Sequence, residues 1–308
     1  MRRILGVFAL LLVTGCAAGE AIPASEKAPE KPVAKVVGRE AAGGRVDEIT
    51  IWSPALGREG SVWVLRPEGW TEGSTGWPAL YLLHGCCVGR GDAWLISGEA
   101  DRITAKAKAV VIVPEAGTMG WYADWVKGPA WETFHMTEVR DLLEPLYGIG
   151  DRRAVAGLSM GGHGAMGYAA RHPGVFQAAA SFSGVLDIRS DPPAFSDFLR
   201  GEGVEPDEIW GPYPGREANW KAHNPTDLVA GLKGLRLYIS SGNGEPGPLD
   251  LGRPRDAGEA AILVENRNFA AAAEKAGVEV TTDFYGDGTH RWPYWSRALE
   301  RALPVLLG

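Results

Sequence analysis

The segment Gly157-Leu158-Ser159-Met160-Gly161 constrains the fold of this chain more than any other. A short run of β-type residues, 153–156, precedes it, and a helix-compatible run follows it. This is the strand, sharp turn and helix of a nucleophile elbow, which raises a serine hydroxyl above the edge of a parallel sheet. Glycines must flank the serine because the turn strains its backbone and neighbouring Cβ atoms would obstruct it. In a chain with 42 glycines the pattern alone is weak, so its context carries the argument.

Strand-like and helix-like segments alternate along the rest of the chain. The predicted strands are residues 45–53, 61–66, 79–83, 109–114, 153–156, 176–182, 235–240 and 278–285. The predicted helices are residues 131–147, 259–276 and 295–306. This alternation predicts an α/β fold with a single doubly wound, mainly parallel sheet and helices on both faces. The Pro-rich, poorly periodic residues 188–221 are predicted to be an insertion over the active-site edge.

The N-terminus is typical of an export signal. Two arginines precede a run of apolar residues, 4–13, which is too short to span a bilayer. The run ends in Leu11-Leu12-Val13-Thr14-Gly15-Cys16, which resembles a bacterial lipoprotein box. That resemblance implies removal of residues 1–15 and lipidation of Cys16, so we expect a membrane-anchored lipoprotein outside the cytoplasm. The alternative is a secretory peptide cleaved near Ala17, which would release the protein.

Residues 17–42 are rich in Ala, Pro, Glu and Lys and have no hydrophobic period. Such a composition predicts a flexible tether. We therefore expect three parts: a signal peptide at 1–15, a tether at 16–42 and a folded domain at 43–308.

The net charge of the chain and the spacing of its possible metal ligands exclude some classes of function. The formal net charge is −7 and no cluster of Lys and Arg interrupts it, which argues against a nucleic-acid partner. No group of His, Asp and Glu has the spacing of metal ligands, so neither a metal nor a cofactor is expected. If Cys16 is lipidated, only the adjacent Cys86 and Cys87 remain, and two buried thiols are favoured over a vicinal disulfide. The oligomeric state is not constrained.

A serine hydroxyl is a poor nucleophile and needs a nearby base. His290 is the best candidate, because it follows the last predicted strand in the glycine-lined turn Gly286-Asp287-Gly288-Thr289-His290. A third group must orient the imidazole, and it should follow strand 235–240. The acids in this region are Glu245, Asp250, Asp256, Glu259 and Glu265, and the residues alone leave the choice open. The order serine, acid, histidine is that of α/β-hydrolases.

A tetrahedral intermediate needs fixed N–H donors for its negative charge. The amide of Met160, directly after the serine, supplies one. The loop that follows strand 79–83 is expected to supply the other, and Cys86 is its best candidate.

These motifs resemble those of the esterase D-like family, and most of all the secreted mycobacterial mycolyltransferases. The matching segments are Tyr81-Leu82-Leu83-His84-Gly85, Trp131-Glu132-Thr133-Phe134, Gly157-Leu158-Ser159-Met160, Trp210-Gly211-Pro212, Asn224-Pro225-Thr226, Gly242-Asn243-Gly244 and Gly288-Thr289-His290-Arg291-Trp292-Pro293-Tyr294-Trp295. They recur in order from about residue 62 to about residue 306. The resemblance implies an α/β-hydrolase fold.

The resemblance also implies roles for individual residues. It makes Ser159 the nucleophile, His290 the base and Glu259 the acid, with Glu245 and Glu265 as alternatives. It assigns the oxyanion hole to the amides of Cys86 and Met160, and Trp292 matches a tryptophan that lines the sugar site.

Two positions depart from the family pattern. His84 and Cys87 stand where the mycolyltransferases have an aspartate and an arginine that contact trehalose, which leaves these two as the substrate-binding candidates. Without that charged pair water becomes the favoured acceptor, so we expect an extracytoplasmic serine esterase acting on an ester or acyl-lipid substrate. The alternative is an acyltransferase that uses a sugar or glycerol acceptor. An inactive hydrolase fold serving as a surface binding protein is disfavoured, because no triad member is missing.

Overall fold

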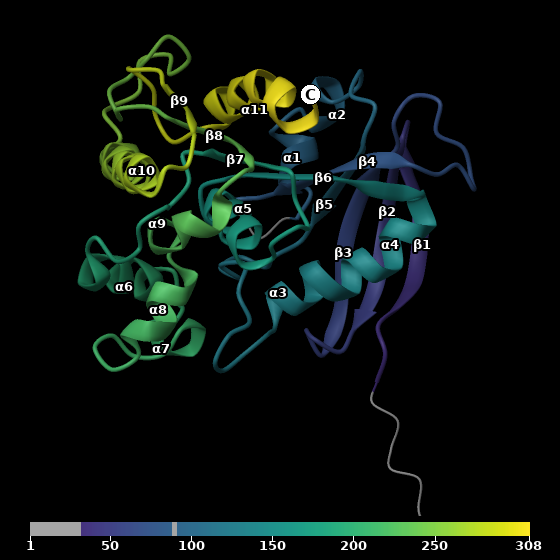
Figure 1. Cartoon of the computed structure of the whole chain (residues 1–308), viewed down its shortest axis with the longest axis horizontal. Coiled ribbons are helices and arrows are strands. Elements are labelled where there is room, and N and C mark those ends of the chain that lie inside the picture. Colours follow the sequence, from purple (N-terminus) through teal and green to yellow (C-terminus); the bar gives the residue numbers. More distant parts are fainter. Residues whose placement is uncertain (1–31, 88–90) are drawn as a thin grey trace, which may run out of the picture. The chain divides into compact units, whose positions relative to one another are not determined.

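The computed structural model describes residues 32–87 and 91–308, and the folded unit runs from Val33 to Gly308 (Figure 1). Within these residues a nine-stranded sheet has the order β1-β2-β3-β5-β4-β6-β7-β8-β9. In this order the neighbours β1, β2, β3 and β5 pair antiparallel. The neighbours β5, β4, β6, β7, β8 and β9 pair parallel. The strands are β1 Lys35–Gly43, β2 Val46–Ser53, β3 Arg58–Leu65, β4 Trp77–Leu83, β5 Val110–Pro114, β6 Ile149–Leu158, β7 Ala178–Phe182, β8 Arg236–Ser241 and β9 Thr281–Phe284.

Helices cover both faces of this sheet (Figure 1). Successive residues of β4 point to opposite faces, so Leu82 and Leu83 belong to different cores. The core of Leu82 is closed by α1 Ala93–Ile96, α2 Ala100–Ile103 and α11 Trp292–Leu307. The core of Leu83 is closed by α3 Trp131–Thr133, the π-helical turn η1 Phe134–Val139, α4 Arg140–Tyr147, α5 Met160–Arg171 and α10 Ala257–Ala276. The predicted doubly wound, mainly parallel sheet is confirmed.

Strand β1 lies in the segment predicted to be a tether, and that prediction is wrong from Lys35 onward. β1 pairs antiparallel with β2, from Lys35 opposite Trp52 to Gly43 opposite Val46. Most of its side chains are exposed, so the strand is held by backbone hydrogen bonds and carries no hydrophobic alternation to reveal it. The export signal, Cys16 and the first part of the tether lie outside the described residues.

The Pro-rich insertion forms short helices rather than irregular chain. They are α6 Pro192–Gly201, α7 Pro206–Ile209 and α8 Glu217–His223, followed by α9 Pro225–Leu228 and the 3₁₀ turn η2 Val229–Leu232. Proline opens three of these helices, because its missing N–H is not needed at a first helical position. Buried Trp210 and Trp220 pack against each other at 5.4 Å between ring centroids. Trp210 also packs against Trp121 at 6.0 Å, which fixes the insertion to the domain.

Residues 32–87 and 91–308 lack two kinds of feature. No helix among them is both long and apolar enough to cross a membrane. The same residues contain no group of three His, Cys, Asp or Glu side chains arranged to hold a metal ion.

Candidate active site

Ser159 occupies a sharp turn between β6 and α5. Its φ of 53° and ψ of −121° are strained for a residue with a side chain. The turn is tight on both sides: a Cβ at Gly157 would lie 2.2 Å from the Gly161 carbonyl oxygen, and one at Gly161 would lie 2.3 Å from the Leu83 oxygen. Glycine is therefore required at both positions, which is the physical basis of the motif.

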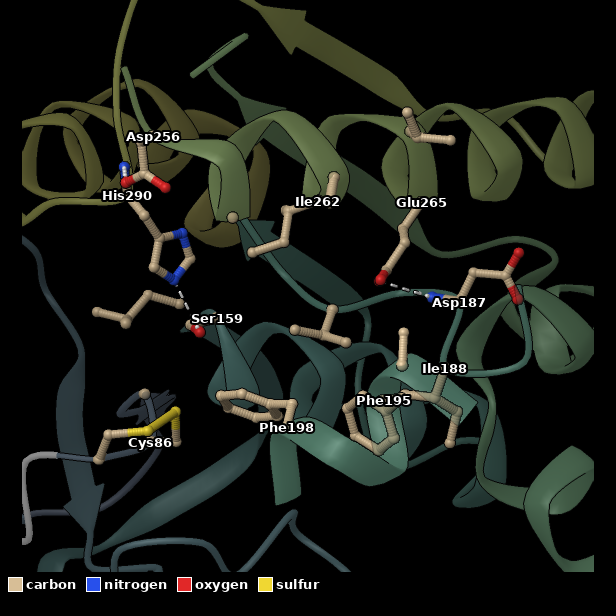
Figure 2. Close-up of a pocket in the computed structure, with 18 of the residues that line it drawn as sticks. Cys86, Ser159, Asp187, Ile188, Phe195, Phe198, Asp256, Ile262, Glu265 and His290 are labelled. Carbon is tan, nitrogen blue, oxygen red and sulfur yellow. Dashed lines mark hydrogen bonds between the residues drawn. A yellow bond between two sulfur atoms is a disulfide. The ribbon is translucent and has the colours of Figure 1, made fainter. Parts of the chain in front are cut away.

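His290 follows β9 and faces Ser159 (Figure 2). Its Nε2 lies 2.9 Å from Ser159 Oγ, and its Nδ1 lies 2.7 Å from Glu259 Oε2. The Trp295 ring packs edge-on against the imidazole at 4.8 Å between centroids. The structure therefore brings the predicted nucleophile, base and acid into one chain of hydrogen bonds.

Glu259 is fully buried in the first turn of α10. Its Oε1 accepts hydrogen bonds from Ser183 Oγ at 2.8 Å, Ser241 Oγ at 3.1 Å and the Gly242 N–H at 2.7 Å. These donors come from the ends of β7 and β8, so the sheet itself sets the orientation of the carboxyl group. Oε2 is left to face His290.

Asp256 ties the acid and the base together through their backbones. As the N-cap of α10 it accepts from the Glu259 N–H through Oδ1 at 3.0 Å. Its Oδ2 accepts from the His290 N–H, also at 3.0 Å. One carboxylate thus fixes the start of the helix and the histidine loop.

The other candidate acids lie elsewhere. Exposed Glu245 pairs with Arg255 at 2.8 Å. Asp250 accepts hydrogen bonds from Thr289 and from the Tyr294 hydroxyl. Glu265 Oε2 accepts from a backbone N–H, that of Asp187, at 3.2 Å. Of the acids considered from the sequence, Glu259 alone contacts the imidazole.

The loop after β4 lies against the nucleophile, as expected for an oxyanion site. A Cβ at Gly85 would come within 3.3 Å of Ser159 Cβ. The Cys87 N–H donates to the Thr118 oxygen at 3.0 Å, which fixes the loop, whereas the Cys86 N–H donates no hydrogen bond within the described residues. Met160 is the first residue of α5, so its N–H has no partner within the helix.

Cys86 and Cys87 form a vicinal disulfide at the edge of this site (Figure 2). The expectation of two free thiols is wrong. Cys87 adopts a φ of 72°, a loop conformation that the sequence did not predict, and the pairing depends on that local backbone path.

His84 does not reach the substrate side, so its assignment as a substrate-binding residue is wrong. Its ring is buried, with Nδ1 2.7 Å from the Gly85 oxygen and Nε2 accepting from the Ala116 N–H at 2.9 Å. Burial lowers the pKa of His84, consistent with a neutral ring that donates through Nδ1. His84 orders the loop from behind.

A cavity of about 1030 Å³ opens at Ser159. Cys86, Cys87 and Trp292 line it. Sequence reasoning missed its other apolar wall residues, which are Trp121, Leu158, Val185, Ile188, Phe195, Phe198, Ile262, Val264 and Trp295. The spacing of Phe195 and Phe198, which places both on one helix face, was an available signal.

Comparison with known proteins settles the family. The family model described as "Putative esterase" matches residues 53–306. This chain belongs to that esterase family. Diacylglycerol acyltransferase/mycolyltransferase Ag85B of Mycobacterium intracellulare is 30% identical over 279 residues, which cover 85% of this chain and 82% of the relative. Esterase Rv1288 of Mycobacterium tuberculosis is 30% identical over 241 residues, covering 73% of this chain and 51% of the relative.

Solved structures agree with this placement. MPT51 (FbpC1) of Mycobacterium tuberculosis superposes with a TM-score of 0.74 at 26% identity, covering 86% of this chain and 99% of the neighbour. A ferulic acid esterase superposes with a TM-score of 0.61 at 27% identity, covering 89% of this chain and 98% of the neighbour. The expected α/β-hydrolase fold and the resemblance to mycolyltransferases are confirmed. Because it belongs to this family, the chain is an enzyme that acts on esters through a serine, either as a hydrolase or as an acyltransferase.

Proposed function

We propose that this chain is an extracytoplasmic serine esterase that hydrolyses carboxylic esters through Ser159, His290 and Glu259. One observation carries the proposal. The hydrogen bonds Ser159–His290 and His290–Glu259, at 2.9 and 2.7 Å, end at the opening of a largely apolar cavity. A serine hydroxyl next to such a base is activated as a nucleophile, and the cavity accommodates an apolar acyl group.

The reaction proceeds through an acyl-enzyme. Ser159 Oγ attacks the ester carbonyl carbon while His290 Nε2 takes its proton, and Glu259 stabilises the imidazolium that forms. The N–H groups of Cys86 and Met160 donate to the developing oxyanion. The intermediate collapses when His290 returns the proton to the leaving alcohol. Water then attacks the acyl-enzyme with the same base, which releases the acid and restores the serine.

Transfer to an alcohol acceptor is the second candidate. It is supported by the 30% identity to a diacylglycerol acyltransferase/mycolyltransferase. Water is favoured because His84 is buried behind the loop and Cys87 is held in a disulfide, so neither supplies a charged contact for a sugar. The acyltransferase would need polar acceptor contacts elsewhere in the cavity.

Hydrolysis of p-nitrophenyl esters by residues 33–308 tests the proposal, with graded acyl chain lengths. We expect Ser159→Ala to lower kcat by about six orders of magnitude. Exposed Ser97 is the matched control, and Ser97→Ala should retain full activity. Equal turnover by the wild type and Ser159→Ala would exclude Ser159 as the nucleophile. Adding glycerol separates the two candidates, because a transferase forms acyl-glycerol in preference to free acid.

The location outside the cytoplasm rests on the N-terminal sequence, which precedes the described residues. We propose that residues 1–15 direct export and that Cys16 is lipidated. Expressed in a bacterial host, the full chain should partition into the detergent phase of a Triton X-114 extract, and Cys16→Ser should move to the aqueous phase. Aqueous partitioning of both proteins would favour the plain secretory alternative.

A further inference from the structure

An acidic side chain lies in the wall of the apolar cavity, away from the catalytic serine. Helix α10 carries Glu259 in its first turn and Glu265 six residues later, which places the Cα of Glu265 about 9 Å farther along the helix axis. Figure 2 shows Glu265 extending from α10 toward Asp187, with Ile262 between it and the catalytic end. Ile188 and Phe195 form the opposite wall.

No cationic side chain neutralises Glu265 within the described part of the chain. Its Oε2 accepts from the Asp187 N–H at 3.2 Å. Arg189, two residues after Asp187, pairs with Asp227 at 2.5 Å through Nη1. Burial, with the Asp187 carboxylate adding to it, raises the pKa of Glu265 to about 7, although backbone N–H groups act in the opposite direction.

The side chain of Asp187 bonds to other residues and not to Glu265. Its carboxylate is occupied by the side-chain amides of Asn224 at 2.9 Å and Asn268 at 3.0 Å. These bonds also hold the loop after β7, so the position of Asp187 does not depend on Glu265 alone. Glu265 therefore remains an acid with spare hydrogen-bonding capacity facing an apolar space.

A carboxyl group in such a wall discriminates between ligands. Covering the free hydrogen-bonding sites of Glu265 with an alkyl chain costs free energy, because water leaves these sites and no new hydrogen bond replaces it. A ligand hydroxyl that reaches the carboxyl removes the cost.

We propose that Glu265 selects esters whose acyl group carries a hydroxyl at its far end, where the hydroxyl reaches the Glu265 carboxyl in the cavity wall. The inference rests on the proposed esterase function and narrows its substrate class. Acyl groups that end in a carboxylate are disfavoured, because the carboxylates of Asp187 and Asp191 also line the cavity.

The test compares two series of p-nitrophenyl esters, plain alkanoates and ω-hydroxyalkanoates of the same chain lengths. For the wild type, kcat/KM should favour the hydroxy ester about tenfold at the chain length that reaches Glu265, and little at shorter lengths. Glu265→Leu should abolish that preference, so that kcat/KM becomes equal for the hydroxy ester and the plain ester of the same length. Glu265→Gln, which keeps an acceptor for the Asp187 N–H, should preserve part of it.

Asn268→Ala is the matched control, because it loosens the same loop without changing the polarity of the cavity wall. It should lower kcat/KM equally for both series and leave their ratio unchanged. If Glu265→Leu behaves in the same way, Glu265 only ties the loop and the inference fails. A wild type that shows no hydroxyl preference at any length also overturns it, while plain-ester turnover keeps the esterase proposal intact. No plain-ester turnover by the wild type would instead overturn the proposed function.

Discussion

Glu259 accepts three hydrogen bonds in addition to its contact with the His290 imidazole. Three donors converge on Oε1, which leaves Oε2 with a single direction in which to face His290. An ionised carboxylate in that position requires the proton of a neutral His290 to sit on Nδ1, so Nε2 is free to accept the serine proton. The orientation of the base is therefore decided by backbone and hydroxyl groups at the ends of two strands.

Glu259→Gln should lower kcat by about four orders of magnitude, because an amide can present a donor to Nδ1 and favour the wrong tautomer. Steady-state kinetics on a p-nitrophenyl ester measures the loss, and circular dichroism should show an unchanged fold. The matched change Glu245→Gln, at an exposed side chain, should leave kcat within twofold or so of the wild type. Near-normal activity of Glu259→Gln would remove Glu259 from the proposed triad.

Local sequence predicted some of these residues better than others. Ser159 and His290 were found from short motifs, because each lies in a turn with its own glycine signature. Glu259 could not be chosen from the residues alone, since its contact with His290 depends on how α10 docks on the sheet. His84 was misassigned because its ring bonds to Ala116, a partner on another strand end that no local pattern reveals.

At the level of elements, α5 is anchored at its C-terminal end as well as at the serine. Glu132 of α3 accepts from Arg171 Nη2 at 2.7 Å and lies 2.6 Å from His172 Nε2. Burial alone would raise the pKa of Glu132, but the His172 hydrogen bond and the Arg171 charge lower it to about 2. This cluster holds the helix that carries the nucleophile.

The lowered pKa of Glu132 predicts a stability that depends on pH. Its stabilisation is fully present above the ordinary value of 4.5 and is lost as the pH falls toward about 2. Glu132→Gln should lower the free energy of unfolding by roughly 2–3 kcal/mol at pH 7, and the difference should shrink steadily below pH 4.5. Urea unfolding at pH 7 and pH 3 measures both values, with exposed Glu274→Gln as the control. A difference independent of pH would contradict the assignment.

The elements that the sequence did not predict lack a clear hydrophobic period. β1 has no buried face along most of its length, so backbone pairing rather than side-chain pattern defines it. The helices of the insertion are short and begin at prolines, so they contain too few turns for a period to show. By contrast, the apolar strands from β4 to β8 were predicted because both of their faces are buried.

For the whole molecule, β1 completes the sheet and shields β2. Arg39 in β1 bonds to Asp47 at 3.2 Å and lies over the Tyr147 ring at 5.2 Å, so the strand contributes side-chain contacts as well. Removing it would uncover β2 as a new edge, which favours pairing between molecules.

A fragment of residues 44–308 should therefore melt several degrees below residues 33–308 and should self-associate. Calorimetry and size-exclusion chromatography compare the two fragments. The folded fraction of residues 44–308 should have the same kcat on p-nitrophenyl esters as residues 33–308, because the deletion removes no strand end that supports the triad. Equal melting temperatures would mean that β1 contributes little to stability.

The chain enters the folded unit through β1 at one edge of the sheet, whereas Ser159 follows β6, five strand positions away. At the usual spacing between strands this separates the entry point from the nucleophile by about 24 Å. A chemical handle, fusion partner or solid support attached ahead of Lys35 would thus sit well away from the catalytic serine. The amino-terminal side is the natural place to immobilise this enzyme for use as a catalyst.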